Sequence, residues 1–177
     1  LIFLFGRTFY SDRVGLVAVV AASVMPLFAV GSILMTIDPL SVFFWAAAAL
    51  SFWKALEQPD HKRFWVLTGL WVGLGFQAKY TNAAELISFL LFLLLTPGKR
   101  RLIFTRGTFL MLGTLFLFVL PILLWNAFRE WIGALHVFEG GDFDRGFRPD
   151  AGKFVGFWLL QAIVVSPLMF LVMLAGA

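Results

Sequence analysis

The chain alternates between long apolar runs and short polar segments, and this pattern predicts membrane-spanning helices. A run of about twenty apolar residues is the length that crosses the hydrocarbon core of a bilayer. We expect spans at residues 14–35, 39–53, 64–78, 82–96, 107–126 and 154–177, with a kink at Pro26. Several of these runs are short for a full span, which tilt or flanking residues would compensate. Small residues in GLWVGLG, residues 69–75, favour close helix packing.

The polar segments fall into two sets when the predicted spans alternate across the membrane. Residues 6–13, 54–63 and 98–107 together carry nine Lys and Arg against three acids. The other set, which holds Asp38, Lys79, Tyr80, Glu85 and residues 126–153, carries five Lys and Arg against seven acids. An excess of Lys and Arg in short loops marks the cytoplasmic side of a membrane protein. We therefore expect the second set on the outer side.

Composition supports a membrane protein and excludes several other classes. The chain is 61% hydrophobic and only 14% charged, whereas soluble domains are about half apolar and a quarter charged. It has no cysteine, which excludes disulfides, zinc–thiolate sites and a thiol nucleophile. The net charge of +4 is divided among short loops, so we expect no nucleic-acid binding. We expect an all-α, polytopic transmembrane helix bundle of about six membrane helices, with residues 1–177 an internal fragment of one domain.

Asp38 is the carboxylate that most needs an explanation, because it lies between two apolar runs. Followed by Pro39, it has the features of a helix N-cap, where the helix dipole favours a negative charge. The alternative interpretation is that Asp38 orients a substrate or helps to hold a divalent cation at the outer rim of the bundle.

Lys79 and Tyr80 end the third predicted span on the same side as Asp38. A lysine there complements the helix dipole, and a tyrosine suits the membrane interface. The functional alternative is that Lys79 pairs with a lipid phosphate. Glu85 follows one turn into the next span, where it could pair with Lys79 or face the interior of the bundle.

Residues 125–138 have apolar side chains at helical spacing, which predicts an interfacial amphipathic helix with His136 near its end. His136 could pack at the interface or bind a metal. The acidic loop that follows contains Asp142 and Asp144 but lacks the remaining ligands of an EF-hand.

Four segments in this order resemble the polytopic glycosyltransferases of the GT-C class: ILMTIDPLSVFFWAAAAL, GLWVGLGFQAKYT, LPILLWN and WIGALHVFEGG. The nearest resemblance is to bacterial family 39-type enzymes, relatives of protein O-mannosyltransferases and lipid A aminoarabinose transferases. It covers nearly the whole chain.

The resemblance implies sugar transfer from a polyprenyl-phosphate-linked donor to a lipid, glycan or protein acceptor, on the extracytoplasmic face of the bacterial inner membrane. It implies a supporting role for Asp38 and substrate binding by Lys79, Tyr80, Asn126 and His136, with Asp38 and His136 as possible ligands of a divalent metal. The primary catalytic acid of such enzymes lies in an outer loop that this chain lacks, so we expect it upstream and leave the catalytic residue unknown.

Two other classes stay open at this point. A secondary transporter or lipid flippase would use Asp38, Lys79 and Glu85 as gating charges, but it should show inverted repeats and ionisable residues near the bilayer midplane. We find no clear internal repeat. A purely structural membrane subunit would leave the outer polar segments without a purpose.

Overall fold

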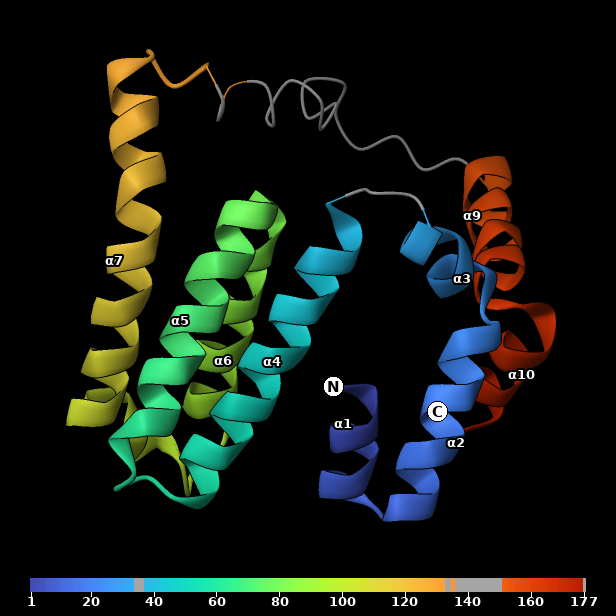
Figure 1. Ribbon diagram of the computed structural model, residues 1–177, viewed down its shortest axis with the longest axis horizontal. Helices are drawn as coiled ribbons and strands as arrows, with labels where there is room; N and C mark the ends of the chain where they lie inside the picture. The colour runs from blue at the N-terminus through green and yellow to red at the C-terminus, as the bar shows by residue number, and fades with distance from the viewer. Residues whose placement is uncertain (34–36, 133–134, 136–150, 177) are drawn as a thin grey trace. The chain divides into compact units, whose positions relative to one another are not determined.

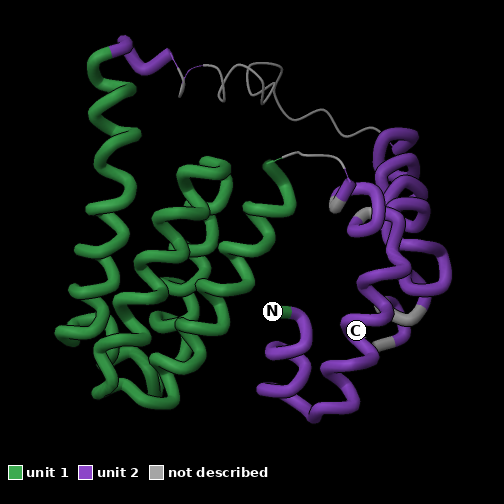
Figure 2. Tube along the Cα trace, viewed as in Figure 1, with its two compact units in different colours: residues 1, 37–128 green, residues 2–36, 129–177 purple. Residues whose placement is uncertain are grey.

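The computed structural model describes residues 1–33, 37–132, 135 and 151–176. Every element within these ranges is helical, which confirms the expected all-α class for the part of the chain that the structure describes. The chain divides into two compact units: residues 37–128 with residue 1, and residues 2–36 with residues 129–177 (Figure 2). That residues 1–177 form one domain stays a prediction.

The first unit, residues 37–128, is a bundle of α-helices linked by 3₁₀ turns (Figure 1). Its elements are α4 (Asp38–Glu57), α5 (Lys62–Ala78), η1 (Tyr80–Asn82), α6 (Ala83–Leu95), η2 (Arg100–Phe104) and α7 (Arg106–Phe128). Helix α5 packs against both α4 and α7. Because short connections make consecutive helices antiparallel, the start of α4 and the ends of α5 and α7 lie at one end of the unit. The second to fifth predicted spans each correspond to one of these helices.

Aromatic and small side chains hold this bundle together. Trp65 and Met111 are fully buried, and the ring of Phe52 on α4 stacks on that of Phe89 on α6 with centroids 4.2 Å apart. Gly69 and Gly73 of α5 lie directly against α7. A Cβ atom on Gly69 would collide with the Met111 carbonyl oxygen, and one on Gly73 would lie 2.7 Å from Phe118 Cβ. The close packing predicted for residues 69–75 is confirmed at these two glycines.

The second unit consists of shorter helices: α1 (Ile2–Phe9), α2 (Asp12–Val24), α3 (Pro26–Ile33), α9 (Ala151–Val165) and α10 (Pro167–Gly176). Helices α1 and α2 form a hairpin in which a Cβ on Gly6 would lie 2.5 Å from the Gly15 Cα. The Ser11 side chain caps α2 by accepting a hydrogen bond of 3.3 Å from the Val14 backbone amide. Helix α3 packs against α9, and α9 packs against α10.

Proline divides two of the predicted spans, so the expectation of a single helix was wrong at both places. In the first span, Met25 is extended (ψ 127°) and Pro26 starts a new helix, a full break where a kink was expected. In the last span, Ser166 has φ 82° and Pro167 starts α10. The common cause is the proline ring, which disfavours the α conformation in the preceding residue and provides no N–H to continue the helix.

The predicted amphipathic helix at residues 125–138 does not form as one helix. Residues 125–128 are the last turn of α7, and Glu130 and Trp131 then adopt left-handed backbone conformations with φ 53° and 60°. These angles interrupt a right-handed helix. The rest of the predicted segment, His136 included, lies almost wholly outside the described residues.

Two described helices, α4 and α7, are long and apolar enough to cross a bilayer by length and composition. The apolar stretches Tyr80–Leu95 and Ala151–Val165 are shorter. The number of six membrane helices therefore stays a prediction.

Candidate functional site

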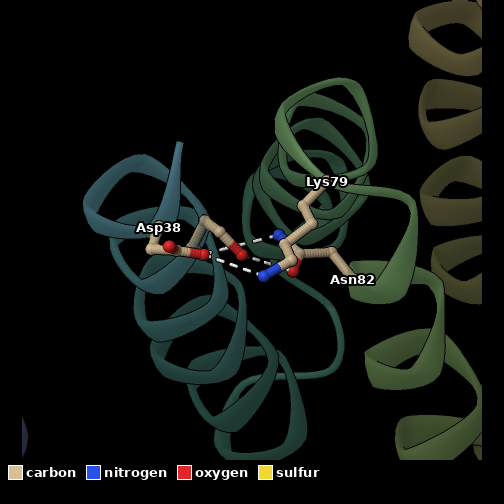
Figure 3. Close-up of polar contacts among 4 residues, drawn as sticks. Asp38, Lys79 and Asn82 are labelled. Carbon is tan, nitrogen blue, oxygen red and sulfur yellow. Dashed lines mark hydrogen bonds and ion pairs between the residues drawn. The ribbon is translucent and has the colours of Figure 1, made fainter. Parts of the chain in front are cut away.

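Polar side chains gather at one end of the first unit, where α4 begins and where α5 and α7 end. We call this the polar end, and it consists of Asp38, Ser41, Lys79, Tyr80, Asn82 and Asn126. Figure 3 shows Asp38 on α4 facing Lys79 and Asn82, which belong to the connection between α5 and α6. Residues far apart in the sequence are thus joined at this end by hydrogen bonds and one ion pair.

Asp38 and Lys79 form the ion pair. Lys79 Nζ donates to Asp38 Oδ1 over 2.8 Å, and the two side chains are 42% and 62% exposed, respectively. Ion pairs this exposed contribute only about 0–1 kcal/mol to stability, because water screens the charges. The Lys79 ammonium is therefore oriented by Asp38 and yet easily released to another anion.

The predicted N-cap role of Asp38 was wrong by one position. Ile37 is the N-cap of α4, and Asp38 lies in the first turn of the helix, with Pro39 next to it. The helix dipole still favours a carboxylate there. The sequence did not indicate the partner of Asp38, which is Lys79 at the end of α5.

Lys79 ends α5, as the sequence predicted. Its backbone is extended (φ −156°), and its N–H donates to the Gly75 carbonyl over 2.9 Å, which closes the last turn of the helix. The chain then passes directly into η1, so Lys79 and Tyr80 leave the helix in different directions. One residue reaches α4 and the other reaches α7.

Hydrogen bonds between Asn82 and Ser41 support the ion pair of Asp38 and Lys79. Ser41 Oγ donates to Asn82 Oδ1 over 2.7 Å, and Asn82 Nδ2 donates to the Ser41 carbonyl over 3.4 Å. Both side chains are buried. Ser41 lies one turn after Asp38 and Asn82 three residues after Lys79, so the two bonds fix the segments that carry the ion pair.

Tyr80 and Asn126 form the link to α7. Asn126 Nδ2 donates to the Tyr80 hydroxyl over 3.4 Å and to the Ile122 carbonyl over 3.0 Å. Asn126 is 3% exposed, and its Oδ1 has no hydrogen-bond partner among the described residues. A buried acceptor without a partner is costly, so this oxygen is available to a donor group from outside the described chain.

Glu85 lies in the first turn of α6, with 1% of its surface exposed. The sequence left open whether Glu85 pairs with Lys79 or faces the interior of the bundle. In the structure it faces the interior and does not pair with Lys79. Neither carboxylate oxygen has a hydrogen-bond partner within the described ranges.

The described residues of the polar end do not form a metal site. Across the described residues there is no group of three His, Cys, Asp or Glu side chains that could hold one. Asp38 is engaged by the Lys79 ammonium, and a cation beside it would be repelled. His136, the other possible ligand, lies outside the described residues, as do Asp142 and Asp144.

Sequence reasoning identified Asp38, Lys79, Tyr80 and Asn126, and the structure brings these four to the same end of the first unit. It missed Ser41 and Asn82. Both are small polar residues near the ends of apolar runs. Their spacing in the sequence could have indicated them, because Ser41 follows Asp38 by three residues and Asn82 follows Lys79 by three residues.

The apolar helices suit a membrane protein by length and composition, and the first unit has a charged and amide-rich site at one end of its bundle. Residues 1–125 of the chain match the model of the dolichyl-phosphate-mannose-protein mannosyltransferase family, and the chain belongs to that family. The match confirms the resemblance to membrane glycosyltransferases and extends through Trp125, one residue short of Asn126.

Membership implies glycosyltransferase activity, which favours a transferase over the transporter and flippase alternatives. No curated protein and no solved structure matches the chain.

Proposed function

We propose that the chain is part of a membrane glycosyltransferase that moves a sugar from a polyprenyl-phosphate-linked donor to a lipid, glycan or protein acceptor. The reaction takes place on the extracytoplasmic face of a bacterial inner membrane. Family membership supports the reaction class, and the donor, the acceptor and the face of the membrane are part of the proposal.

The observation that carries the proposal is the half-exposed Lys79 ammonium, held 2.8 Å from Asp38 at the end of the bundle opposite its basic loops. Residues 54–63 and 98–107, which are rich in Lys and Arg, lie at the other end and mark the cytoplasmic side by the charge rule. A cation at the outer interface is suited to the phosphate of a lipid-linked donor.

The chemistry is a displacement at the anomeric carbon of the donor sugar. An acceptor hydroxyl or amine forms the new bond to that carbon, and the bond from carbon to the phosphate oxygen breaks. The departing phosphate gains negative charge, which the Lys79 ammonium stabilises. A carboxylate takes the acceptor proton. Asp38 supports the departure of the phosphate by orienting Lys79. The resemblance implies that the carboxylate that acts as this base is a different residue.

Tyr80 and Asn126 are proposed to bind the donor beside Lys79. Their mutual hydrogen bond fixes both side chains, and the free Oδ1 of Asn126 can accept a hydrogen bond from a sugar hydroxyl. We assign His136 to the same substrate site on the resemblance alone.

The test is sugar transfer by the complete enzyme from a polyprenyl-phosphate donor in membranes. Asp38→Asn and Lys79→Ala should each reduce kcat/KM for the donor by at least about tenfold, the factor that corresponds to about 1.4 kcal/mol of lost transition-state stabilisation. Lys79→Arg retains the charge and should retain part of the activity.

Thr81→Ala is the matched control, because Thr81 is exposed in the same connection. It should transfer sugar at the wild-type rate. If Asp38→Asn and Lys79→Ala also transfer sugar at the wild-type rate while inserted normally, the assignment of the site is wrong.

A further inference from the structure

The end of the first unit opposite the polar end carries a concentration of cations that the proposed reaction does not use. We call it the basic end and define it as residues 54–63 and 99–106. It contains seven Lys and Arg and two acids, Glu57 and Asp60.

Three contacts bring the two segments of the basic end together. Lys99 Nζ donates to the Leu56 carbonyl over 2.8 Å, which joins the η2 segment to the last turn of α4. Trp65 Nε1 donates to the Pro59 carbonyl over 3.0 Å, and Gly107 lies so close to the Trp65 ring that a Cβ there would be 2.5 Å from Nε1. The positive charges of both segments are therefore held at one surface.

Some of these cations already have a partner within the protein. Lys99 is bound to the Leu56 carbonyl, Arg100 Nε donates to the Leu94 carbonyl over 2.5 Å, and the Arg63 guanidinium lies 4.6 Å from the centroid of the Phe64 ring. These contacts explain their positions without any external ligand.

Lys62, Arg101 and Arg106 are different. All three are exposed, and none of their side chains makes a hydrogen bond or an ion pair with any residue in the described ranges. Glu57 and Asp60 are nearby in sequence but are not paired with them. Three unpaired cations on one surface repel one another, and an anion there would relieve that repulsion.

The position of these cations selects a lipid as the anion. The basic end lies where α4 ends and α7 begins, and these are the two helices long enough to cross a bilayer. It therefore lies at the depth of the phospholipid headgroups. Phe104, 82% exposed between Arg101 and Arg106, provides an apolar side chain that suits the boundary between headgroups and acyl chains.

We propose that the basic end binds the phosphodiester headgroups of anionic phospholipids through Lys62, Arg101 and Arg106, with Phe104 inserted beside them. This site is separate from the polar end and does not depend on the proposed reaction. Its ligand is a structural lipid of the surrounding leaflet and not a donor or an acceptor.

The test measures binding of fluorescent phosphatidylglycerol to the complete protein in phosphatidylcholine nanodiscs. Lys62→Gln, Arg101→Gln and Arg106→Gln combined should weaken binding about one hundredfold, from the attraction of three charges to an anionic headgroup. The matched control is Lys62→Arg, Arg101→Lys and Arg106→Lys combined, which retains every charge and should bind within about threefold of wild type.

Loop charges also orient a membrane protein, so each variant needs a check on its topology. Residues 1–177 contain no cysteine. In a protein whose other cysteines, if any, are replaced, a single cysteine introduced at exposed Gln58 reports by its labelling whether the basic end is still cytoplasmic. If the triple Gln variant inserts wrongly, Arg101→Gln and Arg106→Gln are measured singly, and each should weaken binding about fivefold.

Two results would overturn the proposal. One is equal affinity for fluorescent phosphatidylglycerol in wild type and in a correctly inserted Gln variant. The other comes from thermal unfolding of the complete protein with either phosphatidylglycerol or inorganic phosphate added. If inorganic phosphate raises the midpoint of unfolding as much as phosphatidylglycerol does, the site binds soluble anions and not a lipid. A rise with phosphatidylglycerol alone, lost in the Gln variant and retained in the control, supports the lipid.

Discussion

At the scale of single residues, hydrogen bonds to buried side chains determine where the exposed charges stand. Asp38 and Lys79 are both half-exposed and could adopt several rotamers. In contrast, Ser41 and Asn82 are buried and are joined to each other by a hydrogen bond. The position of the ion pair therefore depends on a contact that water does not reach.

Replacing Asn82 by Ala tests this dependence. The change leaves the buried Ser41 hydroxyl without its acceptor, and we expect a loss of about 1–3 kcal/mol in the free energy of unfolding. We also expect a higher KM for the donor, because Lys79 would lose its fixed position. Thermal unfolding in detergent and sugar-transfer kinetics measure the two effects.

Ser88→Ala on the adjoining helix α6 is the control, since the Ser88 side chain bonds only to the Ala84 carbonyl at an exposed position. It should change neither quantity. A wild-type KM in Asn82→Ala would show that Lys79 does not depend on the Ser41–Asn82 contact.

Glu85 allows a second prediction at this scale. A buried carboxyl group without a hydrogen-bond partner destabilises the fold by about 1–3 kcal/mol, because its oxygens lose their hydrogen bonds to water. Glu85→Met should therefore raise the midpoint of thermal unfolding, and Glu57→Met, at an exposed position of α4, should leave it nearly unchanged. A lower midpoint in Glu85→Met would mean that the carboxylate binds a group outside the described residues.

The sequence indicated single residues well where their chemistry stands out from the apolar surroundings. Asp38 and Lys79 are conspicuous as charges between apolar runs, but the bond between them depends on α4 and α5 being neighbours at the correct register. Asn82 and Ser41 are not conspicuous at all, since their importance comes only from burial.

At the scale of helices, the hydrophobic runs predicted where helices begin and end better than they predicted whether one run forms a single helix or two. The runs that became α4, α5, α6 and α7 were placed within a few residues of their observed ends, while those containing Pro26 and Pro167 divided into two helices each. Pro121 lies inside α7 and does not end it. Near it, Gln77 of α5 donates to the Phe118 carbonyl over 2.7 Å, so α7 is supported by its neighbour in the turn before the proline. The sequence cannot show which prolines have such support.

The contact between α5 and α7 gives a prediction at this scale. Gly69→Ala would place a methyl group against the Met111 carbonyl and force the two helices apart, at a cost of about 1–3 kcal/mol. Gly113→Ala is the matched control, because a Cβ there meets nothing within 4 Å, and it should stabilise α7 by about 0.5–1 kcal/mol. Thermal unfolding of both variants decides the matter, and a stable Gly69→Ala would contradict the close packing.

At the scale of the whole molecule, charge is separated along the first unit. The basic end and the polar end lie at opposite ends of α4 and α7, and this separation was the part of the architecture most directly predictable from the sequence, because loop charge and helix alternation are both read without knowing any contact. The division into two units was not predictable, since it depends on how helices pack.

Orientation in the membrane can be tested with single cysteines, because residues 1–177 contain none and any cysteine elsewhere in the protein can be replaced. Thr81→Cys at the polar end should react in intact cells with a maleimide that cannot cross the membrane. Gln58→Cys at the basic end should react only after the membrane is permeabilised. The reverse pattern would place the polar end in the cytoplasm and contradict the proposed face of the reaction.

The proline breaks also bear on how the protein enters the membrane during synthesis. Helices α2 and α3 have 13 and 8 residues, so neither alone reaches the roughly 30 Å of a hydrocarbon core at 1.5 Å per residue. The same holds for α9 and α10, with 15 and 10 residues. A translocon that releases segments into lipid by their hydrophobic length would therefore accept α4 and α7 unaided. We expect the shorter helices to partition into lipid in pairs, after or together with a neighbour.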